Sequence, residues 1–326
     1  MNSILVSCAG RRVSLLGLFQ EAAHSNGWSV IAGDCDPLAP SLYLADQAVR
    51  LPRVTSEDYI PELLRLVEER EIRLIVPTID TELLILAANA EQFLGVGCRV
   101  LISSPEFVEV CGDKWELTAR YSQRGIATAA SWLPPVGGQV ALPGKLFVKP
   151  RDGSASANIY STDREGLNEV LRLVPNAIIQ EELQGDEITI DALIDFEGEP
   201  IHYVPRVRIR TLAGESIQGR TIPDSGVRDW IVNCLALSAR MGARGPITLQ
   251  AFLTTNGPVL TEINPRFGGG FPLGYAAGAH YPEWILQMLE KQKLRPMLGD
   301  YSSGVFMTRY HREHFFTAPL WETVQR

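Results

Sequence analysis

The stretch TEINPRFGGG, Thr261 to Gly270, places a carboxylate, an amide, a guanidinium and three successive glycines within ten residues. Before it, GPITLQAFLTTNGPVL, residues 245–260, has two apolar runs separated by Thr255-Asn256-Gly257, which predicts two strands joined by a short turn. Because side chains alternate across a strand, Glu262 and Asn264 should share one face. The sequence therefore predicts a β-hairpin with one polar face.

The register of this hairpin decides whether Gln250 joins that polar face. A three-residue loop with Gly257 in the left-handed conformation places Gln250 opposite Glu262, whereas a two-residue turn shifts the pairing by one and turns Gln250 away. We expect the three-residue loop. Gln250, Glu262 and Asn264 then present the oxygen ligands that Mg²⁺ takes alongside substrate phosphates, with Mn²⁺ as a second possibility. A solvated polar face is the alternative, and the hairpin alone does not decide between the two.

Length and composition indicate a globular protein of two or three subdomains: 326 residues, 45% apolar and 21% charged. The net charge of −8 argues against nucleic acid as a partner and gives no reason to expect binding to an anionic membrane. The odd number of cysteines, five, without a close metal-type pair, suits a reducing compartment, so a cytoplasmic protein is expected. No uninterrupted 18-residue apolar stretch predicts a membrane span.

Residues 1–110 alternate short apolar runs with helical patterns, which is typical of a parallel α/β sheet. Strands are expected near residues 4–7, 28–32, 73–76 and 99–103. The turn SCAGRRVSL, residues 7–15, lacks the G-x-G-x-x-G pattern, so we do not expect NAD to bind. Charged residues that could line a pocket at the carboxyl edge of this sheet, or could equally be caps and surface charges, are Arg11, Arg12, Asp34, Asp80 and Glu82.

A second unit begins near residue 111 with a helix and a proline-marked connection. LFVKPRDGSASANIYST, residues 146–162, predicts strand, loop and strand. Lys149 ends the first apolar run, and Gly153 to Ser156 are small residues that could wrap phosphate oxygens or form only a turn. In AIIQEELQGDEITIDALID, residues 177–195, one strand stops at two carboxylates and another begins near Glu187. This interruption predicts a linker between subdomains, where backbone groups could meet an adenine ring and a carboxylate could meet ribose hydroxyls.

The order of these motifs along nearly the whole chain resembles the ATP-grasp superfamily. The closest likeness is to one ATP-grasp unit of the carbamoyl-phosphate synthase large subunit and to the ligase of pyrrolysine biosynthesis, whose glycines resemble Gly268 to Gly270. The synthase subunit has two such units and this chain has one, so a complete synthase subunit is not expected. The resemblance implies a mixed α/β and α+β fold: a Rossmann-like pre-ATP-grasp domain at 1–110, a small central lid at 111–186, and a C-terminal α+β subdomain with the metal and substrate site at 187–326.

The resemblance also implies roles for individual residues. It assigns ATP binding to Lys114, Lys149, Gly153, Ser154, Ser156, Glu181, Glu182, Leu183 and Glu187. Of these, Glu181 to Leu183 would contact adenine and Glu187 would contact ribose. It assigns the metal to Gln250, Glu262 and Asn264, and a catalytic role to Arg266 and Lys149.

Candidate substrate residues include arginines from one further pattern. Arg206, Arg208 and Arg210 are spaced by two, so in a strand they share a face that could bind a carboxylate or phosphate; a charged, solvated edge strand is the alternative. The substrate candidates are Arg206, Arg208, Gly268, Gly269 and Arg11. His311 and His314 do not follow the H-E-x-x-H order of metalloproteases, so no metal is expected there.

The function that the resemblance implies is ATP-dependent ligation of a small-molecule carboxylate to an amine through an acyl phosphate, with release of ADP and phosphate. Two alternatives remain open. One is a phosphotransferase like carbamoyl-phosphate synthase without amine ligation, and the other is a non-catalytic, ATP-binding regulatory protein. A homodimer is possible.

Overall fold

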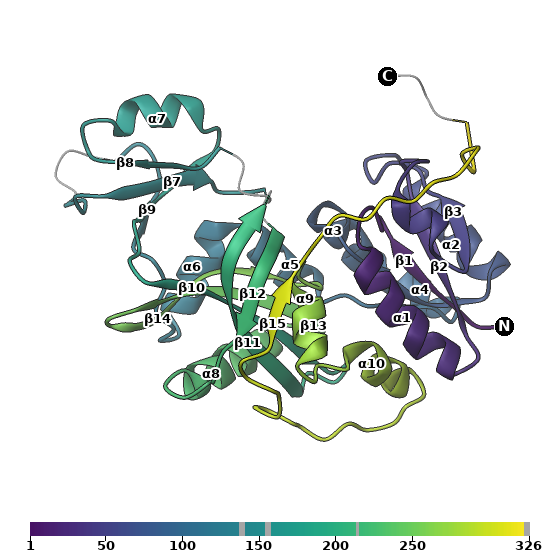
Figure 1. Cartoon of the computed structure of the whole chain (residues 1–326). Coiled ribbons are helices and arrows are strands. Elements are labelled where there is room, and N and C mark those ends of the chain that lie inside the picture. The colour runs from purple at the N-terminus through teal and green to yellow at the C-terminus, as the bar shows by residue number, and fades with distance from the viewer. Residues whose placement is uncertain (137–140, 154–157, 213–214, 323–326) are drawn as a thin grey trace.

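The computed structural model describes residues 1–136, 141–153, 158–212 and 215–322. In this part of the chain the strands form three sheets (Figure 1). Their strand orders are β3-β2-β1-β4-β5, β6-β9-β7-β8 and β14-β13-β10-β11-β12-β15. None of the helices described is long and apolar enough to cross a membrane. The mixed α/β and α+β architecture expected from the sequence is confirmed.

The first sheet is parallel throughout, as predicted. Its strands are β1 (Ser3–Ser7), β2 (Ser29–Asp34), β3 (Gln47–Arg50), β4 (Ile72–Pro77) and β5 (Arg99–Val100). Its helices are α1 (Val13–Ser25), η1 (Pro40–Tyr43), α2 (Tyr59–Glu69), α3 (Asp80–Ala88) and α4 (Ala90–Gly95). Alternation along β1 sends Ile4 and Val6 into the core that contains α1, and Leu5 into the core that contains α2. Both faces are therefore covered, which leaves the carboxyl edge for a ligand.

The small sheet stands apart from the others at the upper left of Figure 1. It follows α5 (Pro105–Gly112) and α6 (Lys114–Ser122), and its elements are β6 (Ser131–Trp132), β7 (Leu146–Pro150), β8 (Tyr160–Thr162), α7 (Leu167–Leu173) and β9 (Ala177–Glu181). Leu146, Val148 and Ile179 pack with Leu167 of α7 on one face. This core is separate from the cores of the rest of the molecule.

The third sheet is antiparallel throughout. Its elements are β10 (Asp186–Ile194), β11 (Pro200–Leu212), β12 (Glu215–Thr221), α8 (Arg228–Arg240), β13 (Gly245–Thr254), β14 (Gly257–Asn264), α9 (Phe271–Ala276), α10 (Tyr281–Leu289) and β15 (Phe306–Thr308). The ring of Phe267, just after β14, meets that of Phe19 on α1 edge to face at 5.7 Å. This shared core fixes the glycine segment, Gly268 to Gly270, which follows β14, against the N-terminal domain.

The hairpin of β13 and β14 corrects one sequence prediction. Thr254 pairs with Gly257, so the loop has two residues and the expected three-residue loop is wrong, although Gly257 does have a positive φ of 107°. A bulge restores the register, because Ala251 pairs with Leu260 while Gln250 pairs with Glu262. The extra residue between them is Thr261, whose Oγ1 donates to the carbonyl of Gln250 at 3.1 Å.

The bulge has a packing cause. Leu260 and Ile263 are each 1% exposed, yet they are three residues apart, and strict alternation would turn them to opposite faces. One inserted residue lets both side chains enter the core. The predicted pairing of Gln250 with Glu262 is confirmed, but it arises from the bulge and not from the loop.

Candidate active site

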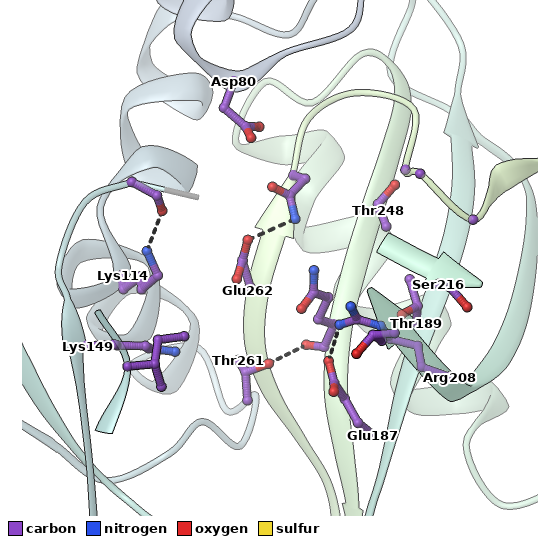
Figure 2. Close-up of a pocket in the computed structure, with 18 of the residues that line it drawn as sticks. Asp80, Lys114, Lys149, Glu187, Thr189, Arg208, Ser216, Thr248, Thr261 and Glu262 are labelled. Carbon is purple, nitrogen blue, oxygen red and sulfur yellow. Dashed lines mark hydrogen bonds and ion pairs between the residues drawn. The ribbon is translucent and has the colours of Figure 1, made fainter. Parts of the chain in front are cut away.

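A cavity of about 790 Å³ is lined by residues of the small sheet, of the third sheet and of the loops at the carboxyl edge of the parallel sheet, and most of the predicted residues line it (Figure 2). Among the predicted residues, its lining includes Arg11, Lys114, Lys149, Gly153, Glu181, Glu182, Leu183, Glu187, Arg206, Arg208, Gln250, Glu262, Asn264, Arg266, Gly268 and Gly269. Ser154 and Ser156 lie outside the described residues. Figure 2 shows Lys114 and Lys149 on one side and Glu262 on the other, so cations and oxygen ligands face the same space.

Lys114 is held at the start of α6 by a network around Asp113. Asp113 caps the helix and also receives two hydrogen bonds from Arg151, at 2.7 and 2.6 Å. The Nζ of Lys114 donates to the carbonyl of Gly153 at 2.8 Å. These contacts fix the lysine against the first residues of the loop that follows β7.

Lys149 is a buried cation near the end of β7, with 8% of its surface exposed. The pKa of its ammonium is lowered to about 8, mainly by burial; the positive charge of Lys114 adds to this shift, and the nearby carboxylates of Glu262 and Glu187 oppose it. An anion placed in the cavity would favour the charged amine, since opposite charges stabilise each other strongly where water is scarce.

The predicted adenine hinge joins the small sheet to the third sheet. Glu181 exchanges two hydrogen bonds with Ala130, one from its own backbone N–H and one to its carboxylate, both at 2.9 Å. The carboxylate of Glu182 accepts a hydrogen bond from Ser161 at 2.9 Å. Both acidic side chains therefore hold the hinge in place, while Leu183 lines the cavity beside them.

Glu187 and Arg208 form an ion pair across neighbouring strands, with Nη1 and Oε1 at 2.7 Å. Arg208 is 12% exposed and Glu187 is 34% exposed. The sequence assigned these two residues to ribose and to substrate, respectively, and the structure places them in contact at one end of the cavity.

The oxygen-rich face of the hairpin has one carboxylate and two amides. The Nδ2 of Asn264 donates to Oε1 of Glu262 at 3.0 Å, and Gln250 lies opposite Glu262 on the neighbouring strand. Among the described residues there is no group of three histidine, cysteine or acidic side chains that could hold a metal. This donor set fits Mg²⁺ that is shared with nucleotide phosphates, and it does not fit an all-protein metal cage.

Arg266 contacts Asp80, which the sequence analysis included among the charged residues that could line a pocket. Its Nε and Nη2 donate to the two carboxylate oxygens of Asp80, at 2.7 and 2.6 Å. Asp80 is the first residue of α3, at the carboxyl edge of the parallel sheet. The two residues are 186 positions apart, so only the tertiary structure shows the pair.

The glycine segment lies directly over a buried ion pair. Arg206 donates to Asp191 at 2.7 and 3.3 Å, and their side chains are 3% and 2% exposed. A Cβ on Gly270 would come within 2.4 Å of the Arg206 guanidinium, and one on Gly268 within 2.9 Å of Thr248 Oγ1. The backbone can therefore lie this close to the Arg206 and Thr248 side chains only if these positions are glycine. The sequence reasoning missed Asp191, although a charge within the apolar run ITIDALI was a signal that a buried partner was needed.

The three acidic candidates of the N-terminal domain, Asp34, Asp80 and Glu82, divide into two groups. Asp80 lines the cavity together with Arg11 and Arg12. Glu82 is fully buried beneath it, and burial raises the pKa of this carboxyl even though it accepts four hydrogen bonds. Asp34 accepts from the backbone of Gly10 at 2.7 Å. Asp34 and Glu82 therefore hold turns in place and are not part of the cavity lining.

Two family models match the chain. The model for the PylC-like N-terminal domain matches residues 4–101, and the model for ATP-grasp in the biosynthetic pathway with Ter operon matches residues 174–305. Residues 4–101 therefore match a PylC-like N-terminal domain and residues 174–305 match an ATP-grasp domain, which confirms the resemblance found in the sequence. The comparison with curated proteins gives no match.

Solved structures share the fold over most of the chain. The biotin carboxylase domain of Hydrogenobacter thermophilus 2-oxoglutarate carboxylase, solved with MgADP and bicarbonate, has a TM-score of 0.74 at 14% identity, covering 93% of this chain and 73% of its own. The L-amino acid ligase from Bacillus licheniformis has a TM-score of 0.69 at 18% identity, covering 90% and 75%. N5-carboxyaminoimidazole synthetase from Staphylococcus aureus, complexed with ADP, has a TM-score of 0.71 at 13% identity, covering 90% and 78%. At these identities the likeness establishes the fold alone.

Proposed function

We propose that this chain is an ATP-dependent carboxylate–amine ligase. The observation that carries the proposal is the cavity in which two buried lysines face the oxygen-rich face of the hairpin, with Arg266 in the same lining. Phosphoryl transfer needs little covalent help from side chains. It needs cations around the transferred group and fixed positions for the reactants. The cavity offers both.

In this proposal ATP lies between the small sheet and the third sheet. Lys114 and Lys149 contact the phosphates, the backbone of 181–183 meets adenine, and Glu187 meets ribose. Gln250, Glu262 and Asn264 would hold Mg²⁺, which would neutralise phosphate charge when bound. We propose domain boundaries near residues 110 and 186, which separate the three sheets.

The reaction begins when the substrate carboxylate takes the terminal phosphoryl group and ADP forms. Lys149 and Arg266 neutralise the charge that spreads over the transferring group. An amine then attacks the acyl carbon, the carbon–oxygen bond to phosphate breaks, and an amide and phosphate result. In this proposal the small sheet closes over the cavity and keeps water from the acyl phosphate; its separate core, which would let it move as a unit, supports this role.

The test is ADP release from MgATP in the presence of pairs of carboxylates and amines, with mass spectrometry of the product. We expect one pair to give stoichiometric ADP, phosphate and amide. Lys149→Ala should lower turnover by roughly two to three orders of magnitude, the scale seen when one preorganised charge-stabilising group is lost. ADP formed with an acid alone would favour the phosphotransferase, and MgATP binding without any turnover would favour the regulatory protein.

A further inference from the structure

Most N–H groups of the Arg266 guanidinium already donate hydrogen bonds within the protein. A guanidinium has five N–H groups. Asp80 takes two, Asn264 Oδ1 accepts from Nη2 at 3.4 Å, and the carbonyl of Phe267 accepts from Nη1 at 3.1 Å. Four of the five N–H groups are therefore engaged, so Arg266 must release a present partner to give an anion two hydrogen bonds, and release of Asp80 frees a complete parallel pair, Nε and Nη2.

The carboxylate of Asp80 would remain in the cavity after such a release. The turn before it is held from below by Glu82, which accepts from the backbone N–H groups of Thr78 at 2.7 Å and Ile79 at 3.2 Å. Figure 2 shows Asp80 extending from the N-terminal domain toward the strand that carries Glu262. With 29% of its side chain exposed, Asp80 lacks full access to water, so loss of its cationic partner is costly.

We propose that the carboxylate substrate is an amino acid that enters between Arg266 and Asp80. This inference rests on the proposed ligase function and names its substrate class. The carboxylate of the amino acid pairs with the guanidinium of Arg266. Its ammonium replaces that guanidinium as the partner of Asp80. The exchange leaves every charge paired. An acid without an ammonium would satisfy Arg266 but would leave Asp80 without the cation that it contacts directly in this structure, and sites built to bind a polar group discriminate strongly against analogues that lack it.

The experiment compares each of the protein amino acids with its des-amino counterpart in the MgATP assay. Examples are glutamate with glutarate, and lysine with 6-aminohexanoate; cadaverine serves as the analogue of lysine without the carboxylate. We expect at least one amino acid to promote ADP release with a kcat/KM at least about tenfold above that of its des-amino counterpart. The inference is overturned if the counterparts are as active, or if no amino acid is active.

The variant Asp80→Asn separates ammonium binding from the positioning of Arg266. If Asp80 binds the ammonium, the preference for the amino acid over its counterpart should fall to about threefold or less, and calorimetric affinity for MgATP should not change. If Asp80 only positions Arg266, both compounds should lose activity equally and the preference should persist, which would overturn the inference. Asp58→Asn removes the same charge at an exposed position of the same domain and should preserve the preference.

Failure of this inference can be told apart from failure of the ligase proposal. If MgATP does not bind, or if no carboxylate of any kind promotes ADP release, the ligase proposal fails and the inference fails with it. If a carboxylate without an ammonium is the best substrate, the ligase proposal stands and only the role of Asp80 is refuted.

Discussion

Raising the pH from 7 to 9 should weaken ATP binding about tenfold through Lys149 alone. Burial lowers the pKa of this lysine to about 8, so in the nucleotide-free protein it is about 90% charged at pH 7 and about 10% charged at pH 9. Phosphate oxygens favour the charged form and raise the pKa in the complex. The difference between the two pH values is about 1.4 kcal/mol of binding free energy.

The sign of this effect follows from proton linkage. The bound state holds more protons than the free state near pH 8, so affinity must fall as pH rises and binding must take up about half a proton at pH 8. Folding has the opposite dependence. An unfolded lysine has the higher pKa, so the contribution of Lys149 to stability rises from about pH 8 up to the ordinary lysine value of 10.5.

Calorimetry with a non-hydrolysable ATP analogue and Mg²⁺, in two buffers of different ionisation enthalpy, measures both affinity and proton uptake. Lys149→Arg keeps a charge at all these pH values, so the pH dependence should disappear. Lys145→Met removes an exposed lysine just before β7 and should leave the dependence intact. Equal affinity at pH 7 and 9 in the parent protein, or an unchanged slope in Lys149→Arg, would refute the reasoning.

Three further predictions follow from other parts of the site. Glu262→Gln should abolish magnesium-dependent ADP formation with little change in the melting temperature of the nucleotide-free protein; full activity would remove Glu262 from the metal site. ATP should bind far more tightly than GTP in calorimetry, because residues 181–183 are expected to meet adenine, and equal affinities would contradict that role. Glu82→Ala should lower the free energy of unfolding in urea by about 3 kcal/mol or more because it orphans four donors. Glu82→Gln keeps an acceptor for the two backbone donors and should cost about 1 kcal/mol; equal losses for both variants would sink this explanation.

Local patterns were enough to determine much of the fold. The alternation of buried strands and amphipathic helices in residues 1–110 predicted the parallel sheet. Each helix or strand must bury its apolar face, and that requirement does not depend on which element covers it. The polar alternation in TEINPRF predicted the oxygen-rich face of β14 for the same reason. Lys149 was found by its position at the end of an apolar run, whereas Lys114 was assigned by the resemblance to the ATP-grasp superfamily.

The partners of the charged residues could not be read from the sequence. Asp80 and Arg266 meet because Phe19 and Phe267 join the N-terminal domain to the glycine segment, and no local pattern contains that contact. Likewise, spacing put Arg206 on a face but could not show that Asp191 holds it.

The hairpin register depends partly on the local sequence and partly on the tertiary structure. The sequence determined that Gln250 and Glu262 would be polar and near each other, since both belong to strands joined by a short turn. Whether they face the same way depended on one inserted residue, Thr261, and the tertiary core decided it. Leu260 and Ile263 both had to be buried, and the bulge is the backbone's response to that requirement.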